Sequence, residues 1–348
     1  MNYPFHALVG FAERLLGAAG LDGDKPSIIS EMLVCADAMG HTTHGLAQLP
    51  GYLREIETGG MAATGEPDIM GDRPSAVLWD GRRLSGVWLT AKAVALAVDR
   101  ARTTGLCAVT IRRSHHIACL ATFLPAATER GLMVIFASSD PAAADVAPFG
   151  GKRPVYSPNP VAVGIPTGGD PILVDVSASI TTNGMSGRLR GEGRRFPGLW
   201  AVDAEGRPSD DPAILVAEPR GSLLPVGGFD HGHKGYGLAL AVEALTQGLS
   251  GYGRADRETR WGASVFVQVL DPEAFGGLTS FTRQTDWLVA ACRNTPPVNP
   301  QRPVRLPGAS ATSGFRAAKE HGVRLHEGIM AGLLPWAEKL DVPLPRTE

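Results

Sequence analysis

The sequence predicts a mixed α/β protein with one large sheet domain and a small helical domain formed by both termini. Segments with apolar residues at helical spacing occupy residues 4–57 and 313–340, and apolar runs of strand length recur between them. Glycine and proline are abundant, with 43 and 27 residues, which fits many tight turns better than a helical bundle. We expect three parts: 1–75 and 310–348 in the helical domain, and 76–309 in the sheet domain.

The N-terminal part is expected to hold three helices. Residues 4–20 and 26–40 each have helical spacing and end on a glycine. A third helix is expected to start near Thr43 or His44. The composition of residues 59–75, rich in Gly, Pro and Asp, then predicts a linker.

Strands and helices are expected to alternate after this linker. The apolar runs predict strands at 76–81, 106–113, 132–139, 160–166, 171–177 and 263–271. Helical spacing predicts helices at 90–105, at 117–131 with an interruption at Pro125, at 234–251, at 280–296 and over 313–340.

Composition and charge exclude several classes of protein. The formal net charge is -2 with both signs interspersed, so we expect no nucleic-acid partner. No apolar run approaches the roughly 20 residues that span a bilayer, so we expect no membrane insertion. The N-terminus lacks the pattern of a secretory signal, and the four cysteines are scattered among apolar neighbours. We therefore expect a cytoplasmic protein with reduced thiols.

Known phosphate-binding motifs are absent from the chain. No G-x-G-x-x-G follows a strand and opens a helix, and no G-x-x-x-x-G-K-[ST] occurs. A Rossmann domain and a P-loop enzyme are both disfavoured. A Gly-rich segment at 227–237 carries Lys234 into a helix, where it could hold a phosphate or could be a flexible loop with a solvated lysine.

Histidines form three short clusters: His41 with His44, His115 with His116, and His231 with His233. The strong zinc pattern spaces two histidines four apart with a glutamate between them, and here threonines separate the first pair. We therefore predict no bound metal and treat His41 as a bystander.

Two of these histidines stand where acid–base catalysis is common. His44 lies at a predicted helix start, and His116 follows the predicted strand 106–113. A neutral imidazole can take or give a proton near pH 7, as the interconversion of a carbonyl and an alcohol requires. Asp175 ends a predicted strand, where a carboxylate can orient an imidazole, bind a ribose hydroxyl or cap a helix. A structural role for each single histidine stays the alternative.

Taken together, these segments resemble the type 2 malate/L-lactate dehydrogenase family, which is distinct from the Rossmann-fold lactate dehydrogenases. The resemblance covers nearly the whole chain, and its motifs follow the order of the family. The motifs are HGLAQLPGYL (44–53), SHHIA (114–118), VAPFGGKRPVYSPNPVAVGIP (146–166), LVDVSAS (173–179), LWAVDAEGRPSDDP (199–212), LLPVGGFDHGHKGYGLAL (223–240) and VRLPG (304–308).

The resemblance implies a fold and an activity. It implies a large mixed-sheet domain with its own, non-Rossmann way of binding NAD or NADP, a small helical domain made from both termini, and a homodimer. It also implies a small-molecule substrate: a 2-oxo acid reduced to a 2-hydroxy acid, or the reverse. Some members instead reduce cyclic imino acids such as piperideine- or pyrroline-2-carboxylate.

The resemblance further implies roles for particular residues. It makes either His116 or His44 the acid/base, with a preference for His116, and places Asp175 beside cofactor and substrate. Substrate contacts are expected from Thr43, Gln48 and Tyr52. Cofactor contacts are expected from Ser138, Asn159, Asp175, Val176, Ser177, Lys234, Gly235, Leu306, Pro307 and Gly308.

The chain departs from the family pattern at the substrate side. An arginine that would bind the substrate carboxylate with two hydrogen bonds is replaced by Gln48, and a common lysine by Met185. Either another cation, Arg54 or Arg188, holds the carboxylate, or the substrate differs. Further departures are Thr42 and Thr43, where aspartate and serine are usual, and Ala309, where glutamate is common.

Two competing hypotheses follow from the same residues. The departures at 42, 43 and 48 allow a nucleotide-binding protein without turnover, and the histidine clusters allow a metal-dependent hydrolase. The sequence does not distinguish NADH from NADPH, since no acidic or basic residue follows a Rossmann strand here.

Overall fold

The computed structural model describes residues 2–346. Its centre is a seven-stranded sheet with the strand order β1-β2-β3-β10-β4-β5-β6, in which β2 and β3 are parallel and all other neighbours antiparallel. The predicted mixed α/β class is thereby confirmed. The strands are β1 (Asp68–Arg73), β2 (Ala76–Asp80), β3 (Leu106–Ser114), β4 (Met133–Ser139), β5 (Pro160–Ile165), β6 (Ile172–Ser177) and β10 (Ala263–Leu270).

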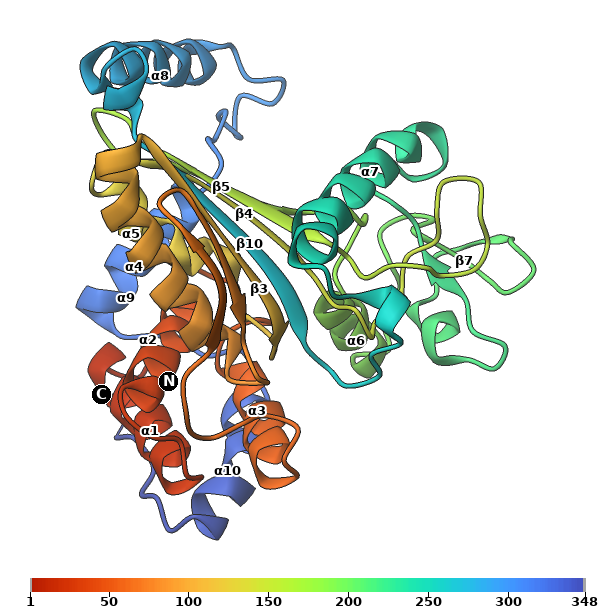
Figure 1. Cartoon of the computed structure of the whole chain (residues 1–348). Coiled ribbons are helices and arrows are strands. Elements are labelled where there is room, and N and C mark those ends of the chain that lie inside the picture. The colour runs from red at the N-terminus through yellow and green to blue at the C-terminus, as the bar shows by residue number, and fades with distance from the viewer. Residues whose placement is uncertain (1, 347–348) are drawn as a thin grey trace.

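Helices pack against the sheet and also lie beyond both of its ends (Figure 1). A small second sheet, in the order β8-β7-β9, lies beside α6 and α7 and consists of β7 (Ala201–Val202), β8 (Pro208–Ser209) and β9 (Ser222–Leu223). The helices are α1 (Phe5–Ala18), α2 (Lys25–Ala38), α3 (Leu49–Glu57), α4 (Gly86–Thr104), α5 (Pro125–Thr128), α6 (Asn183–Gly191), α7 (Gly228–Glu243), α8 (Leu278–Asn294), α9 (Ala309–His321) and α10 (Ile329–Lys339).

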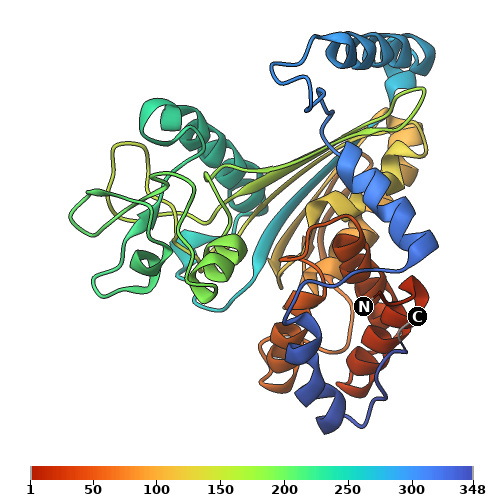
Figure 2. The ribbon, with the colours of Figure 1, turned by 180° about the vertical axis from the view of Figure 1, so that it is seen from behind.

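The two ends of the chain pack together. Helix α9 contacts α2, and α10 contacts α3, so the C-terminal helices lie beside the N-terminal ones, as both views show (Figures 1 and 2). One hydrophobic cluster runs from α1 and α2 through α4 into the sheet strands β3, β4 and β10. The helical group and the sheet therefore share one core, and the boundaries at residues 75 and 310 stay a prediction.

Strand β10 shows why the sheet forms where the sequence predicts it. Its eight residues are β-branched or apolar at most positions, and all but two are buried. A strand that lies between two other strands and is covered on both faces is buried throughout. Its sequence is therefore a nearly continuous run of apolar residues. Strand β10 pairs antiparallel with both β3 and β4, so those two strands run in the same direction. Their carboxyl ends therefore lie at the same end of the sheet.

The structure differs from several sequence-based expectations. The predicted linker 59–75 contains the edge strand β1, whose side chains are mostly exposed and carry no apolar alternation. The third helix begins at Leu49 rather than at Thr43 or His44, because residues 41–45 form a turn first. The expected helix over 117–131 is reduced to a 3₁₀ turn and the four residues of α5.

The Gly-rich segment 227–237 is also not a flexible loop. It forms the first turns of α7, with a kink at His231. None of the described helices has the length and apolar character that crossing a lipid bilayer requires.

Candidate active site

A large cavity opens at the end of the sheet where the carboxyl ends of β3, β4 and β6 lie. Its volume is about 640 Å³, within the range of pockets that bind small molecules. It is lined by residues from 40–48, 116–120, 138–143, 157–160, 175–188 and 261–263. Six separate segments therefore meet around one space.

The turn that carries His44 is built by Asp37 and two glycines. Gly40 ends α2 with φ 88°, and Gly45 stands so close to Asp37 that a Cβ there would lie 2.4 Å from its carboxylate. The buried Asp37 carboxylate accepts a hydrogen bond from the Leu46 N–H at 2.7 Å. Burial raises the pKa of Asp37 to about 7. The turn thus holds His44 at the cavity wall ahead of α3.

His44 is a neutral imidazole in this setting. Its Nδ1 lies 2.8 Å from the Thr43 hydroxyl, which can donate or accept. Burial, with smaller contributions from His41 and Arg188, lowers the pKa of His44 to about 4. Gln48 lines the cavity as well, but its amide donates to the Thr43 carbonyl at 2.7 Å and supports the turn.

His116 reaches the cavity from the end of β3. Its Nδ1 accepts a hydrogen bond from the Ala118 N–H at 3.4 Å and lies 2.7 Å from the Tyr52 hydroxyl. Burial, together with His44 and His115, holds the pKa of His116 well below its usual value. Because Nδ1 is the acceptor, the neutral ring carries its hydrogen on Nε2.

Tyr52 stands behind His116 and does not line the cavity. It is fully buried, and burial raises the pKa of its phenol, so the hydroxyl stays protonated. The structure therefore places the Tyr52 hydroxyl against His116 and outside the cavity lining, and the substrate contact expected from the sequence stays a prediction. Its neighbour His115 points elsewhere, with Nε2 3.3 Å from Glu55.

The two predicted histidines meet across the cavity. The rings of His44 and His116 are stacked with centroids 6.2 Å apart, and Trp261 lies 5.0 Å from the His116 ring. Two imidazoles from segments about 70 positions apart in the chain thus face the same space, both neutral. This arrangement suits proton transfer to and from a bound substrate.

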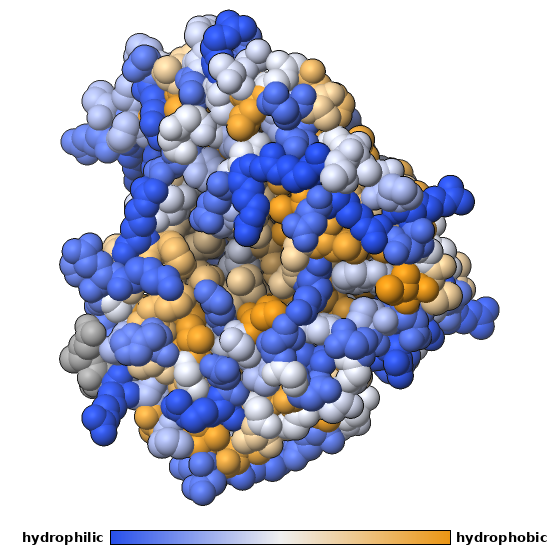
Figure 3. All heavy atoms as spheres, turned by 60° about the vertical axis from the view of Figure 1, so that its left-hand side comes forward, coloured by the Kyte–Doolittle hydropathy of each residue, from blue (hydrophilic) through white to orange (hydrophobic). Residues whose placement is uncertain are grey.

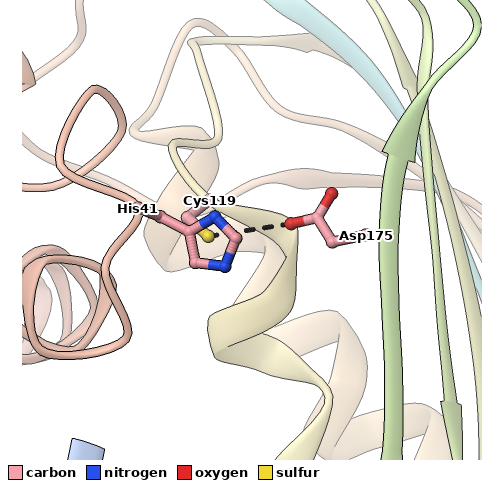
Figure 4. Close-up of side chains that lie close together, drawn as sticks. All are labelled: His41, Cys119 and Asp175. Carbon is pink, nitrogen blue, oxygen red and sulfur yellow. Dashed lines mark hydrogen bonds between the residues drawn. The ribbon is translucent and has the colours of Figure 1, made fainter. Parts of the chain in front are cut away.

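Asp175 lies with His41 and Cys119 on another part of the wall (Figure 4). Its carboxylate accepts from the Ala121 N–H at 3.0 Å and from the Cys119 thiol at 3.7 Å, and burial raises its pKa. His41, expected to be a bystander, lines the cavity, and one of its ring nitrogens is within 4.8 Å of the other two groups.

These three side chains are of types that bind metals, but their chemistry does not favour one. Burial raises the pKa of the Cys119 thiol well above its usual value, so the thiol holds its proton, and metal ligation needs the thiolate. The thiol hydrogen is already directed at Asp175. The absence of a resident metal stays a prediction.

The predicted cofactor residues separate into two groups. The first group lines the cavity and consists of Ser138, Asn159, Asp175, Val176 and Ser177, of which Val176 exposes 49% of its surface there. The Asn159 amide is already used, donating to the Ala239 carbonyl and to Glu243. Small polar groups and an exposed aliphatic side chain on a concave wall fit the flat, polar-edged rings of a dinucleotide.

The remaining predicted cofactor residues do not line this cavity. Lys234 is an exposed residue of α7. Gly235 packs that helix, because a Cβ there would lie 2.5 Å from the Val226 backbone nitrogen. The loop 306–308 lies against β6, with the Leu173 N–H donating to the Pro307 carbonyl.

Sequence reasoning missed several cavity residues, among them Cys119, Asp140 and Trp261, took His41 for a bystander, and gave Arg188 only as an alternative. No local motif marks any of them. Only the packing of α6 against the turn 41–45 brings Arg188 to the site, where Gly184 lets the helix approach Thr43 and His44.

Fold and cavity together place imidazoles, carboxylates and an arginine around a space of the size that a small ligand needs. Malate/L-lactate dehydrogenases as a family match residues 3–334 of the chain. The chain therefore belongs to the malate/L-lactate dehydrogenase family, whose members are NAD(P)-dependent, and it is an oxidoreductase of the hydroxy acid dehydrogenase type.

Individual relatives extend over almost the whole chain. An L-sulfolactate dehydrogenase of Methanothermobacter thermautotrophicus is 28% identical over 344 residues, covering 97% of this chain and 96% of its own. Malate dehydrogenase from Entamoeba histolytica has the same fold, with a TM-score of 0.93, 23% identity and 99% of both chains covered. A delta1-piperideine-2-carboxylate reductase from Pseudomonas syringae pvar. tomato superposes with a TM-score of 0.84 at 26% identity, covering 97% of this chain and 100% of that one.

Proposed function

We propose that the chain interconverts a 2-oxo acid and a 2-hydroxy acid with NADH or NADPH. The observation that carries this proposal is the pair of neutral imidazoles, His44 and His116, facing each other in one cavity. When bound, the nicotinamide cofactor supplies or accepts the hydride. Ser138, Val176 and Ser177 would form the wall that holds it.

The contacts of the two histidines support different roles. His116 accepts hydrogen bonds at Nδ1, so its Nε2–H is a donor that can polarise the substrate oxygen. His44 touches only the Thr43 hydroxyl through Nδ1, and this contact serves either protonation state. His44 would therefore take the hydroxyl proton during oxidation and return it during reduction. This assignment reverses the preference for His116 drawn from the sequence.

The activity is tested with purified protein, NADH or NADPH, and a panel of acceptors. The panel contains pyruvate, oxaloacetate and Δ1-piperideine-2-carboxylate, and the measurement is the loss of nicotinamide absorbance. Turnover of at least one acceptor is expected. Cofactor binding without turnover of any of them would favour the hypothesis of a binding protein and would contradict the proposal.

A cyclic imino acid is the second candidate substrate. The likeness to the delta1-piperideine-2-carboxylate reductase favours it, because that protein shares the fold over nearly all of both chains. The same residues would serve, with the proton delivered to nitrogen instead of oxygen. Faster turnover of the imine than of pyruvate in the panel would select this candidate.

Oxidation of the 2-hydroxy acid should tolerate mildly acid conditions. The base must be unprotonated, and the pKa of His44 is lowered to about 4, so protonation removes the base only at low pH. We expect kcat/KM for oxidation to stay level from about pH 8 to about pH 5 and to fall below that. A fall beginning near pH 7 would contradict the lowered pKa, and circular dichroism at each pH controls for unfolding.

We also propose that two copies of the chain associate through α8. None of the residues of α8 is buried within the chain, and Trp287 and Leu288 expose 69% and 50% of their surface. Figure 3 shows that hydrophobic side chains (orange) also form patches between hydrophilic ones on the face brought forward there. A helix with no buried face and a large exposed aromatic side chain supports this proposal, because a contact with a second copy would bury them.

Replacing Trp287 by glutamate is therefore expected to halve the molar mass of the protein measured by light scattering. The carboxylate of the new glutamate would be buried between the two copies without a group of opposite charge beside it, which opposes association. Leu344→Glu is the matched control, because it places the same charge at an exposed apolar residue outside α8. This variant should leave the molar mass unchanged. An unchanged mass for Trp287→Glu would exclude α8 as the contact.

A further inference from the structure

Arg188 is the one arginine among the described residues that line the cavity, and no lysine lines it. It lies on α6, whose first turn is capped by the Thr182 hydroxyl accepting from the Met185 N–H. Its guanidinium donates to the hydroxyl and the carbonyl of Thr42, at 2.9 and 3.0 Å. Arg188 is thereby fixed at the turn that carries His44.

The two positions at which the family pattern has a cation do not provide one here. The Gln48 amide nitrogen is engaged with the Thr43 carbonyl, and Met185 is apolar. Arg188 lies three residues beyond Met185 on the same helix, on nearly the same helix face. Arg54, the other alternative from the sequence, is on α3 and does not line the cavity.

The charge of Arg188 has no partner of opposite charge in the part of the chain that the structure describes. Among the described residues, no carboxylate lies within ion-pair distance of its guanidinium. Two hydrogen bonds to Thr42 occupy part of its five donors, so others are free for a ligand. A half-buried arginine without an ion-pair partner, next to His44, favours the binding of an anionic group of the ligand.

Acidic side chains face the same cavity from the sheet. Asp140 and Asp175 both line it, and burial raises the pKa of each, that of Asp140 to about 6. At neutral pH at least Asp140 carries negative charge, which repels a further anion. One arginine beside at least one charged carboxylate lets the cavity lining balance a single anionic group on the reacting substrate.

We propose that Arg188 binds the carboxylate of the substrate, and that the substrate is a 2-oxo or imino monocarboxylate rather than a dicarboxylate or sulfonated acid. This inference rests on the proposed function. It predicts that the wild-type protein turns over pyruvate or Δ1-piperideine-2-carboxylate with a higher kcat/KM than oxaloacetate.

Arg188→Gln tests the contact directly. The variant should raise KM for the best monocarboxylate on the order of 10- to 100-fold, the effect of losing hydrogen bonds to a charged group. Its dissociation constant for NADPH or NADH, from nicotinamide fluorescence, should stay within about twofold because Arg188 does not serve the cofactor. Arg190→Gln, an exposed arginine two residues along the same helix, is the matched control and should change neither value.

Methyl pyruvate separates a contact with the carboxylate from a structural effect. The wild type should prefer pyruvate to its uncharged ester, and Arg188→Gln should lose this preference while its thermal unfolding midpoint stays near that of the wild type. If Arg188→Gln does not fold, Arg188→Lys takes its place, since lysine keeps the charge but lacks the planar guanidinium that forms two parallel hydrogen bonds. This variant should lose part of the preference for pyruvate over methyl pyruvate.

Three results would overturn the inference and leave the proposed function intact. They are an unchanged KM in an active Arg188→Gln, weakened binding of the nicotinamide cofactor alone, and preference of the wild type for oxaloacetate. Absence of all turnover by the wild type would instead contradict the proposed function itself.

Discussion

His44→Gln is expected to lower kcat for the preferred substrate by roughly 10²- to 10⁴-fold, the usual contribution of a general acid–base. Glutamine fills a similar space and keeps a polar end, but its amide cannot take up and release a proton as an imidazole does. Steady-state kinetics with saturating cofactor measure the effect. The acid limb of the pH profile of kcat/KM should disappear together with the rate.

His116→Gln distinguishes the two histidines. The glutamine amide can still donate a hydrogen bond, so a donor at this position should be retained in part and kcat should fall by only about tenfold to a hundredfold. Tyr52→Phe removes the hydroxyl beside Nδ1 and should act in the same direction as His116→Gln.

The exposed His231, outside the cavity, supplies the control for these variants, and His231→Gln should leave kcat unchanged. A larger loss in His116→Gln than in His44→Gln would reverse the roles of the two residues. Equal, small losses of kcat in both variants would mean that neither histidine takes part in the proton transfer.

The elements that the sequence predicted well are those with buried apolar faces. The strands β3, β4 and β10 are predicted within a residue or two because their side chains are buried on both faces. The edge strand β1 was missed, since the exposed polar run Asp68–Arg73 gains its structure from the hairpin with β2 and not from its own pattern.

The site was predictable only where a local motif marks it. His44 and His116 stand in short motifs next to element ends, and both line the cavity. Tyr52 also stands in such a motif, yet its side chain is directed behind His116, since a motif fixes neighbours along the chain and not the direction of a side chain. Arg188 is 140 positions from Gln48, and only tertiary packing could show that both face one space.

Lys234 illustrates a different limit. A lysine in a Gly-rich segment before a helix fits a phosphate site or a flexible loop; in the structure the glycines serve helix packing, and the cofactor contact of Lys234 stays a prediction. Gly232 and Gly235 both stand where a Cβ would meet neighbouring atoms within 3 Å, so the segment is glycine-rich to let α7 lie close to its neighbours.

Asp80→Ala is expected to destabilise the fold by about 1–3 kcal/mol, the cost of leaving partly buried hydrogen-bond donors without their acceptor. Asp80 is fully buried at the end of β2 and accepts hydrogen bonds from Arg112 and Arg113, each at 2.9 Å, and from the Arg82 N–H at 3.1 Å. Although burial alone would raise its pKa, these contacts hold the pKa of Asp80 below its usual value.

The same cluster links stability to the site, because Arg113 adopts φ 49° just before the segment that delivers His116. Since the folded pKa of Asp80 is lowered, its stabilisation is present above about pH 4 and is lost as the pH falls through the folded pKa. Asp80→Asn, which keeps the acceptor oxygen, should lose less stability than Asp80→Ala.

Urea unfolding followed by circular dichroism measures this loss, and Asp72→Ala is the matched control. Asp72 also pairs with an arginine, Arg100, but its side chain is 47% exposed, so solvent screens the pair and the midpoint should hardly move. A similar midpoint for both alanine variants would mean that the Asp80 cluster adds no more than a surface pair. A loss of kcat in Asp80→Asn that exceeds its loss of stability would show that the cluster also sets the position of His116.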